Sequence, residues 1–130
     1  MEALLGIFIV ALLASTLLPT YLFANRQVSY GRRMDEATQI AASALEEWRT
    51  RGFDQLPDPA DGNSSVSMPI ANLGELPNPT GTITFTLVDE KLQPIADPDA
   101  DRVLGTATVT WKDAGSSMKK VTITTLYSAN

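Results

Sequence analysis

The fold of this 130-residue chain is decided by EALLGIFIVALLASTLLPTYLFA, which occupies residues 2–24. After Glu2 this stretch contains no charged residue. A helix needs about 20 apolar residues to cross the hydrocarbon core of a bilayer. Residues 3–24 are therefore long enough to span a membrane as a helix, and a plain single-span anchor is the simplest interpretation.

A secretory signal peptide is a second interpretation of the same stretch. It would begin with a basic segment, continue with a shorter apolar core and end at a small-residue cleavage site. Here the acidic residue Glu2 stands where the basic segment would be. The composition therefore disfavours a signal peptide.

Two residues make this stretch more specific than an anchor. An ionised carboxylate among lipid tails is energetically costly and usually has a polar or charged partner. Glu2, at the head of the apolar stretch, is such a carboxylate. Pro19 removes a backbone donor and loosens the helix. In lipid, neighbouring groups must satisfy the carbonyl that a proline frees. The Glu2 carboxylate and the carbonyl freed by Pro19 are therefore both expected to have polar partners within the membrane.

The stretch resembles the N-terminal segment of type IV pilins and of the pseudopilins of type II secretion. These families have a glutamate near the mature N-terminus, then an apolar helix, then a proline at a fixed distance, which here is 19 − 2 = 17 residues. The resemblance implies that Glu2 neutralises the N-terminal amine of a neighbouring subunit and so fixes axial register. It also implies that Pro19 loosens the helix, so that subunits can shift along a growing fibre.

The chain departs from the family at its beginning. Family precursors carry a short basic leader that ends in glycine, with three more residues before the glutamate, whereas only Met1 precedes Glu2. We expect either that the first few residues are missing or that maturation is unusual. Arg26, Arg32 and Arg33 follow the span and by themselves favour a cytoplasmic C-terminal domain. A basic leader would reverse that orientation, and we follow the pilin register.

Helical periodicity continues beyond the apolar stretch. Apolar residues recur at alternating steps of four and three, which is one face of an amphipathic helix. We therefore predict a transmembrane or assembly helix over 1–24 and its amphipathic continuation over 25–52, ending near Gly52. The residues expected to pack on a sheet are Met34, Ala37, Ala41, Leu45 and Trp48.

The remaining residues alternate between apolar and polar, which predicts strands. We expect a short strand over 66–70, held at a sheet edge by Pro69, and longer strands over 82–87, 103–111 and 121–124. The alternation slips near Thr125, which a β-bulge would explain. Residues 53–130 and 25–52 are thus expected to form one globular domain. The predicted fold is α+β, with a long helix packed on an antiparallel sheet of about four strands, and the hairpin over 109–126 resembles the end of minor pilins.

Composition argues against several functions. The chain has 15 acidic and 10 basic residues, a formal net charge of −5, whereas nucleic-acid affinity comes largely from Lys and Arg. It has neither His nor Cys, so the commonest general base and thiolate metal ligands are absent. We therefore expect no direct nucleic-acid site and no enzymatic activity.

The stretch around Asp97, Asp99 and Asp101 spaces three carboxylates at alternate positions, as calcium loops do. Some pseudopilins bind calcium in a loop of this domain. The EF-hand pattern also needs Gly and Glu where this chain has Arg102 and Thr108. These residues are weak calcium candidates, a solvated acidic loop is preferred, and no cofactor is expected.

Together these features predict a structural subunit of a type IV pilus-like filament, with a minor pilin favoured over a major one. The precursor would lie in the bacterial inner membrane, and the assembled subunit in a surface filament with other pilin subunits. A membrane-anchored extracytoplasmic binding module and a pseudopilin of a type II secretion system are the alternatives. An archaeal pilin ranks lower.

Overall fold

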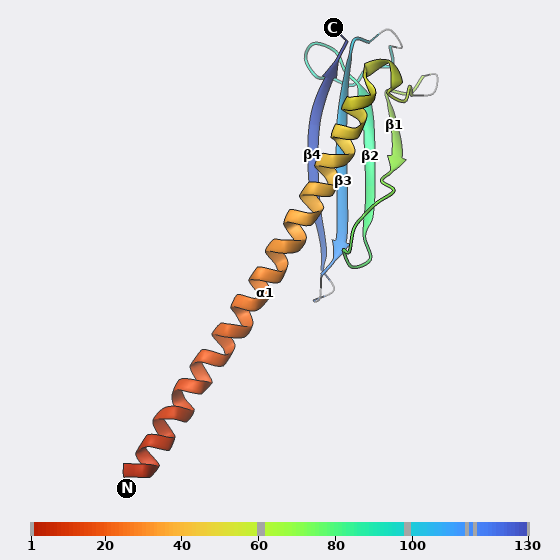
Figure 1. Cartoon of the computed structure of the whole chain (residues 1–130). Coiled ribbons are helices and arrows are strands. Elements are labelled where there is room, and N and C mark those ends of the chain that lie inside the picture. Colours follow the sequence, from red (N-terminus) through yellow and green to blue (C-terminus); the bar gives the residue numbers. More distant parts are fainter. Residues whose placement is uncertain (1, 60–61, 98–99, 114, 116, 130) are drawn as a thin grey trace. The chain divides into compact units, whose positions relative to one another are not determined.

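A computed structural model describes residues 2–59, 62–97, 100–113, 115 and 117–129, with side chains from residue 5 onward. The elements in chain order are α1 (Glu2–Arg51), the 3-10 helix η1 (Phe53–Gln55), β1 (Ser65–Pro69), β2 (Thr80–Leu87), β3 (Arg102–Lys112) and β4 (Met118–Ser128). Figure 1 shows these elements along the chain. The residues form two compact units, Met1–Arg33 and Met34–Asn130. Residues 25–33, which the periodicity groups with the globular domain, belong to the first unit.

The four strands form one sheet in the order β1-β2-β3-β4. Each strand pairs antiparallel with its neighbour, so all connections join adjacent strands. β1 is an edge strand and Pro69 is its last residue. The predicted α+β fold, a long N-terminal helix packed on a four-stranded antiparallel sheet, is confirmed.

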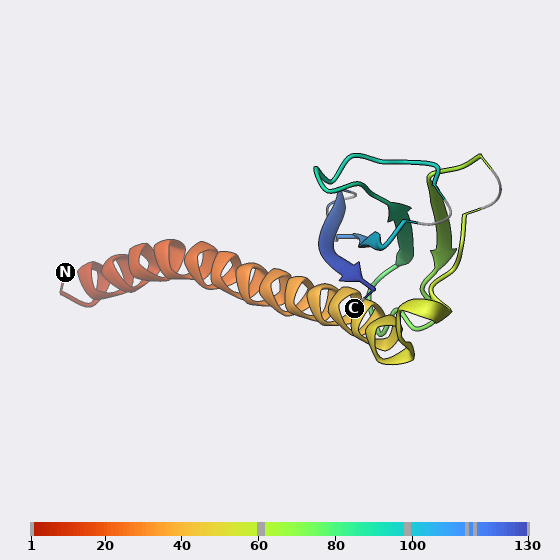
Figure 2. The same ribbon diagram turned by 90° about the horizontal axis from the view of Figure 1, so that it is seen from above.

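The core of the second unit lies between one face of the sheet and residues 34–51 of α1. Figures 1 and 2 both show this part of α1 running along that face. Strict alternation along β2 and β3 directs every second side chain to this inner face. The largest fully buried side chains are Ile83, Phe85, Val88, Val109 and Trp111. Four of these five belong to β2 and β3, so the two central strands supply most of the largest buried side chains.

The helix contributes small side chains to this core. Ala37 and Ala41 are fully buried and Leu45 is nearly so, while Trp48 is half-buried and meets Phe85 edge to face at 5.3 Å. Met34 is more exposed, at 37%. It is the first residue of the second unit, and the buried positions begin one turn later, at Ala37.

β4 is regular where a slip of the alternation was predicted. Its pairing with β3 runs without interruption from Arg102↔Ser128 to Lys112↔Met118, so no bulge occurs near Thr125. Alternation continues and buries Tyr127, while Leu126 is 49% exposed on the outer face. The expected slip near Thr125 is therefore wrong, because the aromatic ring of Tyr127 continues the buried positions of the alternation.

Candidate assembly site

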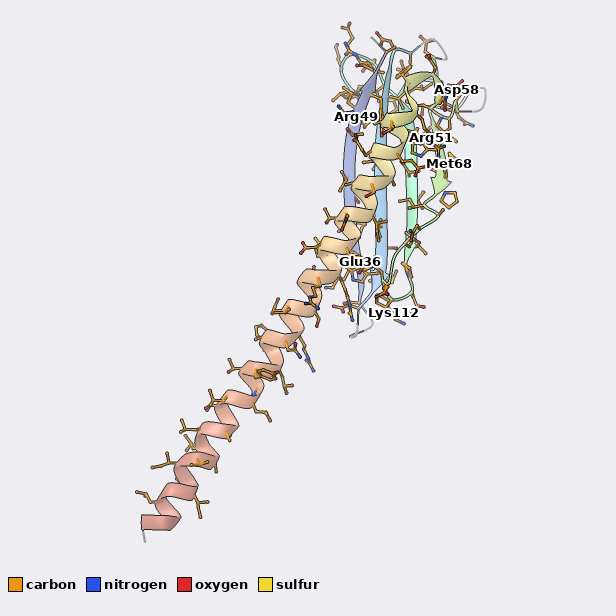
Figure 3. All side chains as sticks on the ribbon, in the orientation of Figure 1. Glu36, Arg49, Arg51, Asp58, Met68 and Lys112 are labelled. Atoms are coloured by element: carbon orange, nitrogen blue, oxygen red, sulfur yellow. The ribbon has the colours of Figure 1, made fainter. Side chains whose placement is uncertain are left out.

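Residues 5–24 of the first unit form a helical segment that is apolar and exposed on all its sides. Residues 5–24 are all exposed, and neighbouring residues on different faces, such as Leu17 and Leu18, are both 65% exposed. Figure 3 shows side chains leaving this part of α1 in every direction. A helix that is hydrophobic all round belongs in a membrane or in a protein core. The segment therefore needs an apolar surrounding that the chain itself does not provide.

Within the described residues, one helix is long and apolar enough to cross a membrane, by length and composition. It starts near the N-terminus, and none of its apolar window is buried against the rest of the chain. The length of helix required for a bilayer is about 20 residues. The chain therefore carries a segment that could anchor it in a membrane.

Pro19 lies inside α1, and the helix is continuous across it. Because proline has no N–H, the Ser15 carbonyl lacks its usual donor four residues later. Hydroxyl groups around this position donate back to carbonyls of their own helix, as with Ser15 Oγ to Leu12 O at 2.8 Å and Thr20 Oγ1 to Thr16 O at 3.0 Å. Such bonds satisfy the hydroxyl donors without water. The segment thus carries an acceptor to which a neighbouring molecule can donate.

Glu2 begins α1, and its side chain lies outside the described part of the structure. The separation of 19 − 2 = 17 positions between Glu2 and Pro19 corresponds to about 25 Å along a helix at 1.5 Å per residue. The helix therefore keeps these two predicted assembly residues apart.

The second unit has an open groove beside β1, with a volume of about 420 Å³. It lies between α1 residues, including Glu36 and Glu47, and the segment that follows β1. Glu36 fixes that segment, since its Oε1 accepts a hydrogen bond of 2.8 Å from the Glu75 N–H. The groove is therefore shaped by a tertiary contact that local sequence patterns do not show.

The described part of the acidic loop holds no recognisable metal site. Asp97 and Asp101 are exposed, and Asp99 lies outside the described residues. Across the described part of the chain, no group of three His, Cys, Asp or Glu residues could hold a metal ion. The calcium hypothesis thus gains no support from the described carboxylates.

Sequence reasoning missed Tyr127 as a structural residue. Its hydroxyl donates a 2.7 Å hydrogen bond to the main-chain oxygen of Leu45. Burial raises the pKa of Tyr127 to about 12, and the negative charge of Glu46 acts in the same direction. The available signal was the strict alternation of β4, which places Tyr127 on the same face as Val121 and Ile123.

No family model, no curated protein and no solved structure matches this chain. The resemblance to pilins therefore rests on the spacing of Glu2 and Pro19, on the apolar helix and on the helix-on-sheet architecture.

Proposed function

We propose that this chain is a structural subunit of a type IV pilus-like filament, inserted in the bacterial inner membrane before assembly and polymerised through residues 2–24. The observation that carries the proposal is the exposure of apolar side chains on all sides of residues 5–24. This segment continues as one helix into the second unit. A bundle of such helices can replace lipid on every side at once.

Apolar packing alone does not specify how these helices align. Lipid tails are as apolar as leucine, so association within a membrane depends on close packing and on polar contacts. In the described apolar segment, polar side chains occur near Pro19, where Ser15, Thr16 and Thr20 cluster. Glu2 supplies the charge at the other end. We assign axial register to Glu2 and local loosening of the helix to Pro19.

The Glu2 carboxylate suits this role on electrostatic grounds. In a medium of low dielectric constant, an unpaired charge is strongly disfavoured and a paired charge is held in place. The N-terminal amine of a neighbouring subunit is a partner that every added copy brings with it. Each addition would then satisfy one carboxylate, so misaligned copies would leave a charge unpaired.

The proposed subunit is a minor pilin and acts without catalysis. Its resemblance to minor pilins at both ends of the chain supports the first assignment. The absence of His and Cys supports the second, because general base and thiolate chemistry would have to come from other groups. A pseudopilin of a secretion system would share the same assembly residues.

A membrane-anchored extracytoplasmic binding module is the second candidate function, and the groove beside β1 favours it. The groove is open and combines carboxylates of α1 with Asn72, which suits a polar ligand. In such a module the apolar segment would face lipid only. The two functions therefore differ in whether the chain leaves the membrane.

Electron microscopy of sheared cell-surface material tests the proposal, with the subunits of the filaments identified by mass spectrometry. We expect the chain in filaments at low abundance relative to a major subunit. Recovery of the chain only in the membrane fraction, with filaments that contain none of it, would support the anchored binding module instead.

A further inference from the structure

The sheet of the second unit has two free edges of unequal length. β4 is one edge and has 11 residues, and β1 is the other and has five. Among the described residues, the backbone of β4 bonds to β3, and no other segment pairs with its outer side. A long free edge presents unpaired N–H and C=O groups to which another strand can add.

The hydrogen bonds at the two ends of β4 identify which of its residues have free backbone groups. The Ala129 N–H donates to Asp101 O at 2.9 Å, and the Asp113 N–H donates to Ser117 O at 3.0 Å. Both bonds continue the β3–β4 ladder, so odd-numbered residues of β4 bond to β3. In an antiparallel pair, bonded and non-bonded residues alternate, so the even-numbered residues of β4 point their N–H and C=O groups away from β3. These are Met118, Lys120, Thr122, Thr124, Leu126 and Ser128.

The same reasoning applies to β1. The Leu87 N–H donates to Ser64 O at 2.8 Å, and the Ile70 N–H donates to Gly81 O at 3.0 Å. Even-numbered residues of β1 thus bond to β2, and Ser65, Ser67 and Pro69 point their groups outward. Pro69 lacks an N–H but costs no bond within the sheet, because the missing donor would face away from β2.

We propose that β4 of one copy pairs antiparallel with β1 of a neighbouring copy, with Thr122 opposite Ser67 of that neighbour. This contact rests on the proposed function, because it joins subunits that face the same way. β1 and β4 already run antiparallel within one sheet. Adding β1 of a neighbour to β4 therefore keeps both copies in one orientation, whereas pairing two β4 strands would reverse one copy.

Side-chain chemistry selects this register. The free groups of both edges belong to residues on the outer face, so Thr122 meets Ser67 and Thr124 meets Ser65. Hydroxyl pairs of this kind already cross the sheet, as between Ser67 and Thr84 at 2.8 Å. Such cross-strand pairs stabilise sheets. A further pair across the new junction would extend the same rows of hydroxyls.

The inner face fits in the same register. Val121 would lie opposite Met68, and Ile123 opposite Val66. Val66, Met68 and Ile123 are only half-buried, and Figure 3 labels Met68 on the edge strand β1. A shift of two residues would instead place Lys119 opposite Met68, or Thr125 opposite Val66, which are poorer apolar contacts.

Charge is complementary across the same contact. Lys119 would lie opposite Ile70 of the neighbour, and Ile70 lines the groove that contains Glu36 and Glu47. A basic side chain on one edge thus approaches two carboxylates beside the other edge. Opposite charges steer association and set register, with an effect that falls as salt rises.

Cysteine cross-linking tests the contact, because the native chain contains no cysteine. A full-length S67C/T122C variant is oxidised in isolated membranes and in sheared filaments. Paired residues in an antiparallel ladder have Cα atoms about 5.5 Å apart, within the range that a disulfide needs. Within one copy β1 and β4 are three strand spacings apart, about 14 Å, so bonds can form only between copies.

We expect S67C/T122C to form disulfide-linked dimers, and larger species where several copies of this chain are successive neighbours, since each copy carries both partners. The matched control is S67C/S128C, whose second cysteine lies on the same edge but three outward-facing residues away. It should give about tenfold less cross-linking, because its Cα atoms would be about 20 Å apart at 3.4 Å per residue. Equal yields from the two variants would contradict the register.

A second pair of variants separates the edge contact from folding. Thr122→Pro removes an outward N–H and no bond to β3, whereas Thr122→Ala keeps that N–H. Each substitution is combined with the cysteine pair S65C/T124C, and the yield of the disulfide cross-link is measured. We expect Thr122→Pro to lower the yield severalfold and Thr122→Ala to leave it unchanged. Equal yields in both would overturn the proposed pairing.

The two proposals fail in distinguishable ways. Filaments that contain the chain but give no S67C/T122C cross-link would overturn the edge contact and leave the filament function intact. Cross-links in membranes without any filament containing the chain would support the edge contact and contradict the filament function.

Discussion

The Tyr127 hydroxyl donates a hydrogen bond of 2.7 Å to the main-chain oxygen of Leu45. This bond joins the last strand to the helix that precedes the whole sheet. The Tyr127 ring also lies 6.2 Å from the Phe85 ring and directly beside Gly105. The position of β4 against α1 is therefore fixed by one polar contact and by the ring beneath it.

We expect Tyr127→Phe to lower the free energy of unfolding of the second unit by about 1 kcal/mol, the usual net value of one hydrogen bond. The ring and its packing remain in the variant. Denaturation of the full chain in detergent micelles, followed by near-ultraviolet circular dichroism, measures the change. Tyr21→Phe is the matched control, since Tyr21 is exposed, and an equal loss in both variants would contradict the role of the Leu45 contact.

Stability should also fall at alkaline pH. The pKa of Tyr127 is raised to about 12 in the folded chain, from 10.0 for a free tyrosine. Between these values the folded state keeps a proton that the unfolded state releases. The free energy of unfolding therefore decreases as pH rises from about 10 to about 12. Unfolding midpoints across this range should show a slope that Tyr127→Phe reduces, and an identical slope in the variant would contradict the assignment.

Gly105 leaves space for the Tyr127 ring. A Cβ atom at this position would lie 2.6 Å from Tyr127 Cε2 and 3.2 Å from Leu45 Cδ2. Overpacking of this kind usually costs about 1–3 kcal/mol. We expect Gly105→Ala to lower the thermal midpoint by several degrees, while Gly115→Ala, where a Cβ meets nothing within 4 Å, changes it little. A tolerated Gly105→Ala would show that the ring can move aside.

Replacing Pro19 separates anchoring from assembly. Pro19→Ala restores an N–H for the Ser15 carbonyl and raises helix propensity by about 3 kcal/mol. We expect unchanged amounts in the membrane and a severalfold loss from filaments, measured by quantitative immunoblotting of both fractions. Leu18→Ala provides the neighbouring control with the same new side chain. Normal incorporation of Pro19→Ala would contradict the proposed loosening role.

The elements of this fold follow from local patterns. The 3.6-residue periodicity predicts α1 to its end at Arg51, and alternation predicts all four strands, because the side chains that define them lie on one face of each element. Ala37, Ala41 and Leu45 were expected on the packed stripe and are buried. These positions could be predicted because the helix is regular through them.

Features that depend on contacts between distant residues could not be predicted in the same way. Met34 shares the helical period of Ala37, but only the end of the sheet decides which of them is covered. Leu126 and Tyr127 are both apolar enough to be buried. Tyr127 is the buried one, because its ring fills the space that Gly105 leaves beside it. The groove depends on Glu36 reaching the Glu75 N–H, 39 residues further along the chain.

The Glu2→Ala variant tests the central claim most directly. Membrane and sheared-filament fractions are compared for the wild type, Glu2→Ala and Glu90→Ala, whose change lies on an exposed loop. If Glu2 sets register in a filament, Glu2→Ala should remain in the membrane at normal amounts and fall at least about tenfold in filaments, because a buried charge pair is lost. Glu90→Ala should resemble the wild type. Full incorporation of Glu2→Ala into filaments, or absence of the wild-type chain from all of them, would contradict the account.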